Sequence, residues 1–439
     1  MTQAPETGDR DYGFATRAIH AGAIPDPVTG ARATPIHQTT SFVFDNAEHA
    51  ASLFNLQTFG NVYSRISNPT VAVFEERVAS LENARAALAC ASGMAAQLTA
   101  LLAILKAGDH IVAASTLYGG TVGQLGVGFS RLGIETTFVD PAAPDKFSRA
   151  IRPNTRALYG ETIGNPLVNV LDIAAVAEVA HAHGLPLVID NTVASPYLCN
   201  PCDFGADIVV HSATKYLGGH GTTMGGVVVE GGKFPWDNGN FPEMVEPSRA
   251  YHGVKFYETF GDFGYTMKAR MEVNRTFGGV LSPINAWLLL QGTETLHLRM
   301  REHCRNALKI ALFLQQHPKV RWVNYPGLPD SPYYQLAKQQ FRTVDGEPGA
   351  SGILTFGIEG GAAAGERFID ACEFLSHLAN IGDAKTLVIH PASTTHRQLN
   401  DDELAQAGVS ADMVRLSVGI EDVDDILWDI NQALERATR

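Results

Sequence analysis

Positive charge is scarce in this chain. Its 439 residues include 33 lysines and arginines against 46 aspartates and glutamates, so the formal net charge is -13. A protein with this balance has no basic surface to neutralise phosphates, which argues against a nucleic-acid partner. Charged residues make up only 18% of the chain and hydrophobic residues 45%. That composition is typical of a globular protein, and the length allows two or three domains with a large buried core.

Cysteine is also rare, and its number is odd. Five cysteines imply no disulfide framework, so the expected compartment is the reducing cytoplasm. Two of them, in Cys199-Asn-Pro-Cys202, have redox or zinc spacing. No second pair lies nearby in the sequence to complete a tetrahedral site, so we interpret the spacing as a coincidence and expect no metal.

The sequence contains no credible membrane span or signal peptide. Residues 1–10 are polar and acidic. The 20 residues between Arg85 and Lys106 carry no charge, but they are rich in alanine and are interrupted by Ser92-Gly93. We interpret them as a buried helix entered through a glycine turn rather than as a transmembrane helix. No membrane partner is expected.

The first 60 residues or so lack sustained periodicity and contain several turn formers. We interpret residues 1–66 as an arm that packs on something else. Helical composition begins after the arm, with helices expected at 71–82 and 95–106.

Short apolar runs then alternate with segments of helical length. Most runs are rich in Val, Ile or Leu and show little alternation, as expected of strands buried on both faces. The runs are 110–114, 135–139, 155–159, 185–189, 207–210 and 225–229. Strands that alternate with helices predict an α/β fold with a mostly parallel sheet.

The residue pattern changes in the second half of the chain. Residues 231–262 are rich in Gly, Pro and aromatic residues without a period, which indicates a structured loop or insertion over a site. A long helical stretch is expected at 283–316, and the chain closes with a helix at 423–438. We therefore expect a large domain over 67–285 and a smaller C-terminal α/β domain over 286–439.

Three motifs fall at ends of predicted elements where an open parallel sheet binds its ligands. Leu187-Val-Ile-Asp190 ends a strand with a carboxylate, and Ile208-Val-Val-His-Ser-Ala-Thr-Lys215 ends the next with two hydroxyls and a lysine. Ala91-Ser-Gly-Met-Ala-Ala96 opens a helix with small residues. Taken singly, each has a simple alternative interpretation: a capping aspartate, a surface lysine and an ordinary turn.

Together the three motifs meet the needs of pyridoxal phosphate. Its phosphate needs a helix N-terminus, for which Gly93 and Met94 are placed, and the hydroxyls of Ser212 and Thr214 are further donors. Its ring nitrogen needs a carboxylate, and Asp190 suits that role. Its aldehyde needs an amine, and Lys215 would hold it as a Schiff base. Nucleotide binding is disfavoured, because the chain has no Walker-type loop and no strand that leads into Gly-x-Gly-x-x-Gly.

The sequence resembles the Cys/Met-metabolism family of pyridoxal-phosphate enzymes from about Thr16 to about Leu434. Several specific motifs occur in the right order. They are Tyr63-Ser-Arg-Ile-Ser-Asn-Pro-Thr70, Ala91-Ser-Gly-Met-Ala95, Leu117-Tyr-Gly-Gly-Thr121, Val188-Ile-Asp-Asn-Thr192, Ser212-Ala-Thr-Lys-Tyr216, Gly218-Gly-His220, His390-Pro-Ala-Ser-Thr-Thr-His396 and Val414-Arg-Leu-Ser-Val-Gly-Ile-Glu421.

The resemblance implies a fold-type I architecture and a homotetramer built from dimers that share active sites, with the cofactor in the large domain. Tyr63 and Arg65 would reach across to the neighbouring subunit's phosphate, although an ordinary surface turn is the alternative. Tyr118 would stack on the pyridine ring and help to activate the amine as an acid/base. Asn165 would donate a hydrogen bond to the cofactor's phenolic oxygen, and Lys215 would remove the Cα proton.

The substrate side of the site is also implied by the resemblance. Arg415 would hold the substrate carboxylate in a bidentate fork, with a buried structural salt bridge as the alternative, and Asn380 would bind substrate beside it. Glu161 and Thr395 would lie near the site. We assign Glu161 no role, because Ile163 stands where many relatives have proline, and we assign Thr395 none, because only the resemblance places it near the site.

Three local features bear on the reaction. Gly221-Thr-Thr223 replaces the Ser-Asp of the cystathionine enzymes, residues 380–387 differ from their Ser-Leu-Gly-Gly pattern, and 231–262 is longer than in the lyases. All three resemble the branch that replaces the acetate of O-acetyl-L-homoserine with sulfide. Cystathionine γ-synthase, γ-lyase and methionine γ-lyase activities, other acyl groups and a catalytically silent relative stay open as alternatives.

Overall fold

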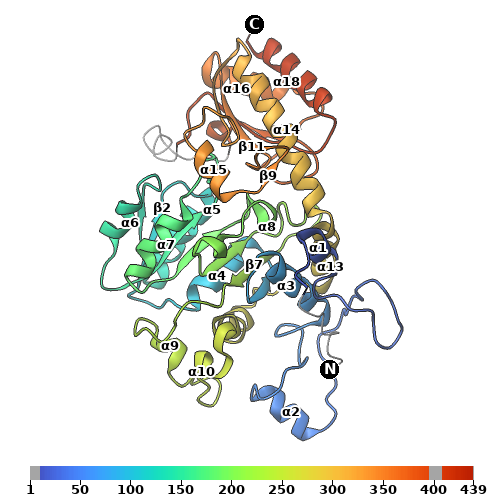
Figure 1. The fold of residues 1–439 in the computed structure, drawn as a ribbon, viewed down its shortest axis with the longest axis vertical. Helices are drawn as coiled ribbons and strands as arrows, with labels where there is room; N and C mark the ends of the chain where they lie inside the picture. The colour runs from blue at the N-terminus through green and yellow to red at the C-terminus, as the bar shows by residue number, and fades with distance from the viewer. Residues whose placement is uncertain (1–9, 395–407, 439) are drawn as a thin grey trace. The chain divides into compact units, whose positions relative to one another are not determined.

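The computed structural model describes residues 10–394 and 408–438 (Figure 1). Each of two compact units is assembled from separate stretches of the chain. The first comprises Met1–Leu105, Asp207–Thr214 and Thr222–His297, and the second Lys106–Ala206, Lys215–Gly221 and Leu298–Arg439. The expected division into an arm (1–66), a large domain (67–285) and a C-terminal domain (286–439) stays a prediction.

The larger sheet has seven strands in the order β1-β7-β6-β5-β4-β2-β3. The first unit supplies the antiparallel strands β1 (Ala86–Cys90), β7 (Gly226–Glu230) and β6 (Ile208–His211). The second unit supplies the parallel strands β5 (Leu187–Asp190), β4 (Thr155–Glu161), β2 (His110–Ala114) and β3 (Glu135–Val139). This mixed sheet between helices confirms the predicted α/β class.

The predicted strands are found within a few residues of their expected bounds. Strands β2 and β3 agree with the prediction at both ends, and β4 continues two residues further, to Glu161. The predicted helix at 283–316 is two helices, α13 (Pro283–Glu294) and α14 (Leu296–Gln316), separated at Thr295.

The prediction for the uncharged stretch between Arg85 and Lys106 was incomplete. Its first five residues form strand β1, which pairs along its whole length with β7, and only then does helix α4 (Gly93–Leu102) begin. A short apolar run does not distinguish a buried strand from a buried helix by periodicity, which explains the error. Within residues 10–394 and 408–438, no helix is both long enough and apolar enough to span a membrane.

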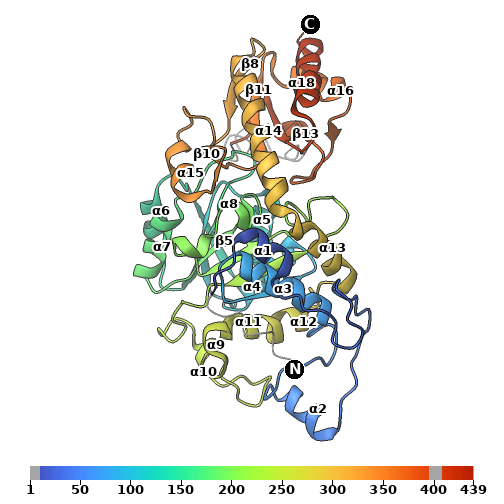
Figure 2. The same ribbon diagram turned by 45° about the vertical axis from the view of Figure 1, so that its right-hand side comes forward.

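The other helices of the first unit are mostly short. They are α1 (Phe14–His20), α2 (Ala47–Phe54), α3 (Pro69–Leu81), α9 (Pro242–Val245), α10 (Phe256–Phe260), α11 (Gly264–Lys268) and α12 (Arg275–Phe277). Helix α2 lies at the tip of a long loop, away from the strands of its unit (Figure 2). Helices α9 and α10 show that the irregular segment 231–262 is structured, as predicted.

The helices of the second unit follow its two sheets. Those near the parallel strands are α5 (Gly119–Gly123), α6 (Pro144–Ala150), α7 (Ile173–Ala182) and α8 (Ser195–Leu198). Those of the C-terminal part are α14, α15 (Tyr334–Gln340), α16 (Gly361–Ala371) and α18 (Val423–Ala437).

A five-stranded sheet in the second unit has the order β12-β13-β14-β11-β8. Its strands are β12 (Ser376–His377), β13 (Leu387–Ile389), β14 (Met413–Ser417), β11 (Ile353–Ile358) and β8 (Val320–Asn324). Val414 and Leu416 join a core with helices α14, α16 and α18, the last two of which lie side by side (Figure 1). Because side chains alternate along a strand, Arg415 lies on the opposite face of the sheet.

Candidate active site

Lys215 follows strand β6 and the short segment Ser212–Thr214. Its Nζ donates a hydrogen bond to Oδ1 of Asn380, 165 residues further along the chain. Burial, followed by the positive charge of Arg415, lowers the pKa of the Lys215 amine from 10.5 to about 8. The amine is therefore much easier to deprotonate than a surface lysine, as a nucleophile or a base requires.

A glycine allows the loop that carries Asn380 to approach the lysine. Gly382 has a φ of +72°, and a Cβ at this position would lie 2.7 Å from the backbone nitrogen of Tyr216. Its own N–H donates to Ser417 Oγ at 2.9 Å, which attaches the loop to strand β14. Any other residue would push the loop away from the residue that follows Lys215.

Arg415 is the central cation of this part of the second unit. Its Nη1 donates to Asn165 Oδ1 at 2.8 Å and its Nη2 to the Asn380 carbonyl at 3.3 Å. The side chain is 8% exposed, and burial lowers its pKa from 12.5 to about 10. Among the described residues, Arg415 Nε is buried without a hydrogen-bond partner. A buried guanidinium with an unsatisfied N–H is suited to an anionic ligand such as a carboxylate.

Two carboxylates lie side by side where neighbouring parallel strands end. Glu161, the last residue of β4, is the register partner of Asp190, the last residue of β5. Glu161 Oε1 accepts a hydrogen bond from the Tyr118 backbone N–H at 2.7 Å. Burial and the charge of Asp190 raise the pKa of Glu161 well above its ordinary value. Asp190 Oδ1 accepts from the backbone N–H of Thr192 at 2.9 Å.

Glu161 has no predicted role from the sequence. The sequence does contain a signal that Glu161 lies at the site. The residue ends a buried strand at the same edge as Asp190, and it precedes Asn165 by four residues. The departure of Ile163 from the family pattern had weakened that signal. Thr395, also left without a role, lies outside the described residues.

In the first unit, Gly93 and Ser212 are in close contact. Helix α4 begins at Gly93, after Ser92 Oγ accepts the N–H of Ala95 at 3.1 Å. A Cβ on Gly93 would lie 2.7 Å from the Cβ of Ser212, so the helix start has no room for a side chain. The N–H groups of Gly93 and Met94 belong to the first turn of the helix, where the positive end of the helix dipole favours an anion.

Thr214 is bonded to the backbone in the same unit. Its Oγ1 accepts the N–H of Gly225 at 3.1 Å and donates to the Gly225 carbonyl at 3.2 Å. The donated proton is therefore engaged with the chain in this structure, which leaves the predicted phosphate role of Thr214 as a prediction.

Tyr63 and Arg65 lie together on an exposed part of the first unit. The Arg65 guanidinium is 5.5 Å from the centre of the Tyr63 ring, and its Nη1 donates to the Arg275 carbonyl at 2.6 Å. Tyr63 is 41% exposed. Both side chains are therefore accessible from solvent, as a role toward another subunit requires.

The predicted site residues fall into groups within the two units. In the second, Lys215, Asn380, Arg415 and Asn165 form one hydrogen-bonded chain, and Glu161 contacts Tyr118 and neighbours Asp190. In the first, Gly93 and Met94 start the helix against Ser212, and Tyr63 lies by Arg65. Within the described part of the chain, no group of three or more His, Cys, Asp and Glu side chains could hold a metal ion.

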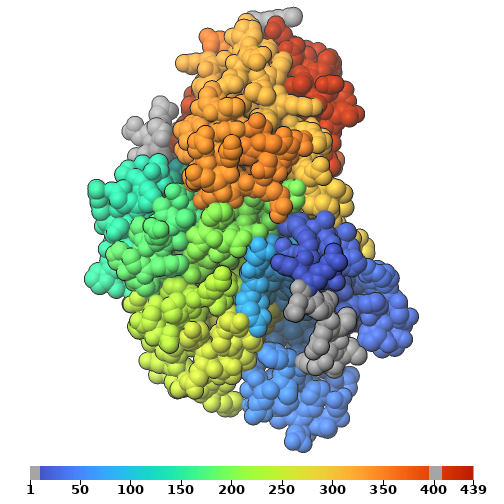
Figure 3. Space-filling view, viewed as in Figure 1, coloured from blue at the N-terminus to red at the C-terminus, as the bar shows by residue number. Residues whose placement is uncertain are grey.

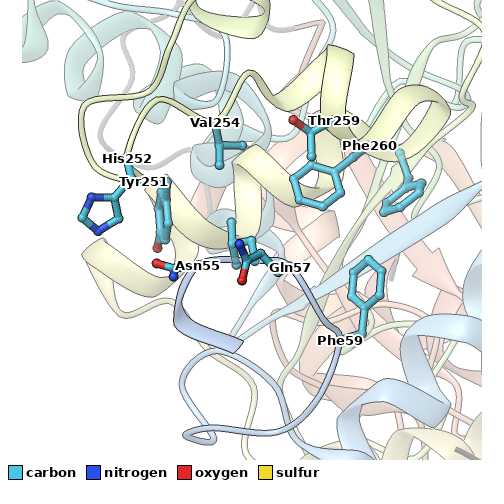
Figure 4. Close-up of a pocket in the computed structure, with 10 residues that line it drawn as sticks. Asn55, Gln57, Phe59, Tyr251, His252, Val254, Thr259 and Phe260 are labelled. Atoms are coloured by element: carbon cyan, nitrogen blue, oxygen red, sulfur yellow. The ribbon is translucent and has the colours of Figure 1, made fainter. Parts of the chain in front are cut away.

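A separate cavity of about 840 Å³ lies in the first unit, and none of the predicted site residues lines it. It is bounded by the loop after α2, with Asn55, Gln57 and Phe59, and by residues around α10, including Tyr251 and Phe260 (Figure 4). The surfaces of these two segments adjoin each other in the space-filling view (Figure 3).

Comparison with known proteins identifies the family. The Cys/Met metabolism PLP-dependent enzyme family matches residues 15–435. The chain belongs to this family. Its cofactor is pyridoxal 5′-phosphate, and the resemblance noted from the motifs is confirmed.

Several relatives are similar over nearly their whole length. The O-acetyl-L-homoserine sulfhydrylase of Leptospira meyeri is 53% identical over 98% of both chains. The O-acetyl-L-homoserine sulfhydrylase 1 of Thermus thermophilus is 49% identical over 96% of this chain and 99% of its own. The homocysteine synthase of Schizosaccharomyces pombe is 50% identical over 97% and 98%.

A solved structure supports the fold and the cofactor. A Campylobacter jejuni protein assigned as an O-acetylhomoserine (thiol)-lyase has a TM-score of 0.93 and 37% identity, over 97% of this chain and 100% of that one. That crystal structure contains N′-pyridoxyl-lysine-5′-monophosphate, a lysine joined to the cofactor.

The residues of this chain fit pyridoxal phosphate. In the second unit, Lys215 offers an amine of lowered pKa, and Asp190 ends its strand with a carboxylate. In the first unit, helix α4 begins at Gly93 against Ser212, so first-turn N–H groups and a hydroxyl lie together as donors that suit an anion such as phosphate.

Proposed function

We propose that the protein converts O-acetyl-L-homoserine and sulfide to L-homocysteine and acetate, the direct sulfhydrylation step of methionine biosynthesis. The observation that carries the proposal is identity of about 50% over nearly the full length of relatives named for this reaction. The buried chain from Lys215 through Asn380 to Arg415 supports it, because it links an amine through one residue to a guanidinium whose Nε has no acceptor.

The substrate is held through its carboxylate by Arg415. The unpartnered Nε and the neighbouring Nη atoms offer a planar pair of donors, which matches two carboxylate oxygens. Asn380 contacts both Lys215 and Arg415 and is therefore placed to bind substrate between base and carboxylate. This leaves the substrate Cα facing the lysine amine.

The cofactor is held through its phosphate, its ring nitrogen, its phenolic oxygen and the face of its ring. Gly93 and Met94 bind the phosphate through their N–H groups, with Ser212 and Thr214 as hydroxyl donors and with Tyr63 and Arg65 from a neighbouring subunit. Asp190 keeps the ring nitrogen protonated, Asn165 binds the phenolic oxygen, and Tyr118 stacks on the ring. Pyridoxal phosphate, when bound, supplies an electron sink for the pair left at the substrate Cα.

Protons are moved by Lys215. Once the substrate amine has taken its place, Nζ accepts the Cα proton, and its lowered pKa makes the free amine available near neutral pH. A second proton leaves Cβ, acetate departs from Cγ, and sulfide forms the new C–S bond at Cγ. The protons return to Cβ and Cα, so the balance is one ester and one sulfide consumed for one thiol and one acetate. Tyr118 helps to activate the amine as an acid/base.

The protein forms a homotetramer that is built from two dimers. Its cellular compartment is the cytoplasm. The exposed pair of Tyr63 and Arg65 supports a shared active site, since neither side chain is buried within its own chain. The odd and small number of cysteines supports a reducing compartment.

A substrate panel tests the reaction. O-acetyl-L-homoserine, O-succinyl-L-homoserine, O-acetyl-L-serine and cystathionine are each incubated with the holoenzyme, with and without sulfide. Sulfide-dependent homocysteine from the acetyl ester, with little 2-oxobutyrate from cystathionine, is the expected result. Efficient cystathionine cleavage without sulfide-dependent turnover would instead identify a γ-lyase.

A further inference from the structure

Glu161 is a buried carboxylate that contacts the backbones of two proposed cofactor-binding residues. It is 6% exposed, and its Oε1 accepts the Tyr118 N–H at 2.7 Å across 43 residues of sequence. The backbone N–H of Asn165 also stabilises the ionised carboxylate. One side chain thus holds the residue that stacks on the ring and the residue that binds its phenolic oxygen.

Within its own segment, the Tyr118 carbonyl accepts the Val122 N–H at 3.1 Å, whereas its N–H is bonded to Glu161. Tyr118 precedes α5, a helix of five residues that begins with Gly119 and Gly120, and it provides no side-chain cap. Its ring is 52% exposed, so packing within the chain covers only part of it. A segment with two glycines has many backbone conformations to lose, and a charged or polar acceptor from a rigid strand restricts them.

The contacts continue from Glu161 to the substrate side. Asn165 Oδ1 accepts from Arg415 Nη1 at 2.8 Å, so Tyr118, Glu161, Asn165 and Arg415 form one connected series within the second unit. Glu161 belongs to β4, a strand of the larger sheet that pairs with both β2 and β5.

We propose that Glu161 is a positioning residue that fixes the backbones of Tyr118 and Asn165 together and so sets the orientation of the cofactor ring relative to Arg415. The proposal rests on the proposed function for the roles of Tyr118 and Asn165. Glu161 itself touches neither substrate nor cofactor in this role.

Glu161 acts in this role as a hydrogen-bond acceptor and not as a second negative charge, because Asp190 lies next to it. The two carboxyl groups are register partners, and burial together with Asp190 favours the protonated form of Glu161. A protonated carboxyl still accepts a hydrogen bond at its carbonyl oxygen. Glutamine, which has the same length and an acceptor oxygen, should therefore replace it.

The test compares Glu161→Ala, which removes the acceptor, with Glu161→Gln, which keeps it, and Glu161→Asp, which is too short to reach. Asp429→Ala is the matched control in the same unit. Asp429 is fully buried and accepts three backbone N–H groups, those of Glu373, Phe374 and Leu375, but lies in the helical core around α18.

Three measurements are made on each holoenzyme: visible circular dichroism of the cofactor band near roughly 420 nm, backbone amide exchange of peptides that contain Tyr118 and Asn165, and kcat and KM. Glu161→Ala should change the dichroism, speed exchange at both peptides and lower kcat roughly ten- to hundred-fold, because small misplacements are costly in catalysis. Glu161→Gln should stay within about threefold of the wild-type kcat, since its acceptor is retained. Asp429→Ala should lower thermal stability and leave the dichroism and kcat unchanged.

Wild-type dichroism and kcat in Glu161→Ala would overturn the proposal, as would the same spectral change in Asp429→Ala. Glu161→Asp carries the test if the alanine variant does not fold, and wild-type behaviour of that variant overturns it equally. If the wild-type enzyme shows no sulfide-dependent turnover, the proposed function fails, while the dichroism and amide exchange still decide the role of Glu161.

Discussion

Arg415 donates a hydrogen bond from Nη1 to Oδ1 of Asn165 at 2.8 Å, across 250 residues of sequence. The bond joins strand β14 of the five-stranded sheet to the segment that follows β4 of the larger sheet, both within the second unit. Because Arg415 also donates to the Asn380 carbonyl, its guanidinium is fixed on two sides before any ligand binds. A preorganised cation of this kind loses little entropy when it binds a carboxylate.

Position 415 should require arginine, and lysine should not replace it. Arg415→Lys keeps the charge but not the planar fork, so we expect KM for O-acetyl-L-homoserine to rise about 10- to 100-fold, the equivalent of one charge-assisted hydrogen bond. Steady-state kinetics at fixed sulfide measure the effect. A lysine variant with wild-type KM would show that the carboxylate is bound elsewhere.

Cofactor capture should follow the ionisation of Lys215. The pKa of its amine is about 8, so the rate at which the apoenzyme captures pyridoxal phosphate should rise as the pH increases through this value. Arg415→Gln removes a positive charge that lowers this pKa, so the midpoint should move to higher pH. Stopped-flow absorbance near roughly 420 nm follows the capture.

Lys215→Ala should abolish that absorbance band and should lower turnover at least about 10²-fold. Lys338→Ala is the control, because that lysine is exposed on α15 and belongs to no proposed site. A midpoint unchanged by Arg415→Gln would contradict the electrostatic part of the prediction.

Gly93→Ala should weaken cofactor binding without unfolding the protein. The added Cβ would lie 2.7 Å from the Cβ of Ser212, so the start of α4 and Ser212 must move apart. We expect the dissociation constant of pyridoxal phosphate to rise roughly ten-fold or more, since phosphate binding depends on the first-turn N–H groups. Equilibrium dialysis measures it, and Gly123→Ala, which would meet no atom within 4 Å, is the matched control.

Glu230 should make folding stability depend on pH near neutrality. Burial raises its pKa from 4.5 to about 7, even though it accepts the N–H of Thr266 at 2.7 Å. A raised carboxyl pKa contributes stability below about 4.5 that is lost as the pH rises through 7. Glu230→Gln stays neutral, so its stability relative to wild type should increase between pH 5 and pH 8, by roughly 2–3 kcal/mol. Denaturant unfolding at both pH values measures this, and parallel pH profiles would contradict it.

Much of the fold followed from apolar runs and their spacing. Strands β2 and β3 were predicted at both ends because each is a five-residue run bounded by polar or turn residues. Strand β1 was missed, since five small apolar residues beside a helix carry no signal that separates the two structures. Its assignment depends on pairing with β7, about 140 residues away in sequence, as the register of Ala86 with Glu230 makes clear.

The sequence pattern suggests candidate site residues at the ends of strands but not in loops. Asp190 ends one buried strand and Lys215 comes four residues after another, so the sequence pattern alone places both near the carboxyl ends of strands. The contact of Asn380 with Lys215 depends on the left-handed backbone at Gly382, and no periodicity reveals it. Asn380 and Arg415 entered the prediction through family resemblance alone.

Strand β14 divides two tasks between alternate residues. Val414 and Leu416 pack into the core of α14, α16 and α18, whereas Arg415 and Ser417 contact Asn165 and Gly382 on the opposite face. Saturation mutagenesis of this strand should therefore give alternating effects. Substitutions at even-numbered positions should lower the abundance of folded protein, and those at odd-numbered positions should lower specific activity. Selection on substrate choice can thus change the residues on one face of the strand, while the residues on the other face, which keep the protein folded, stay the same.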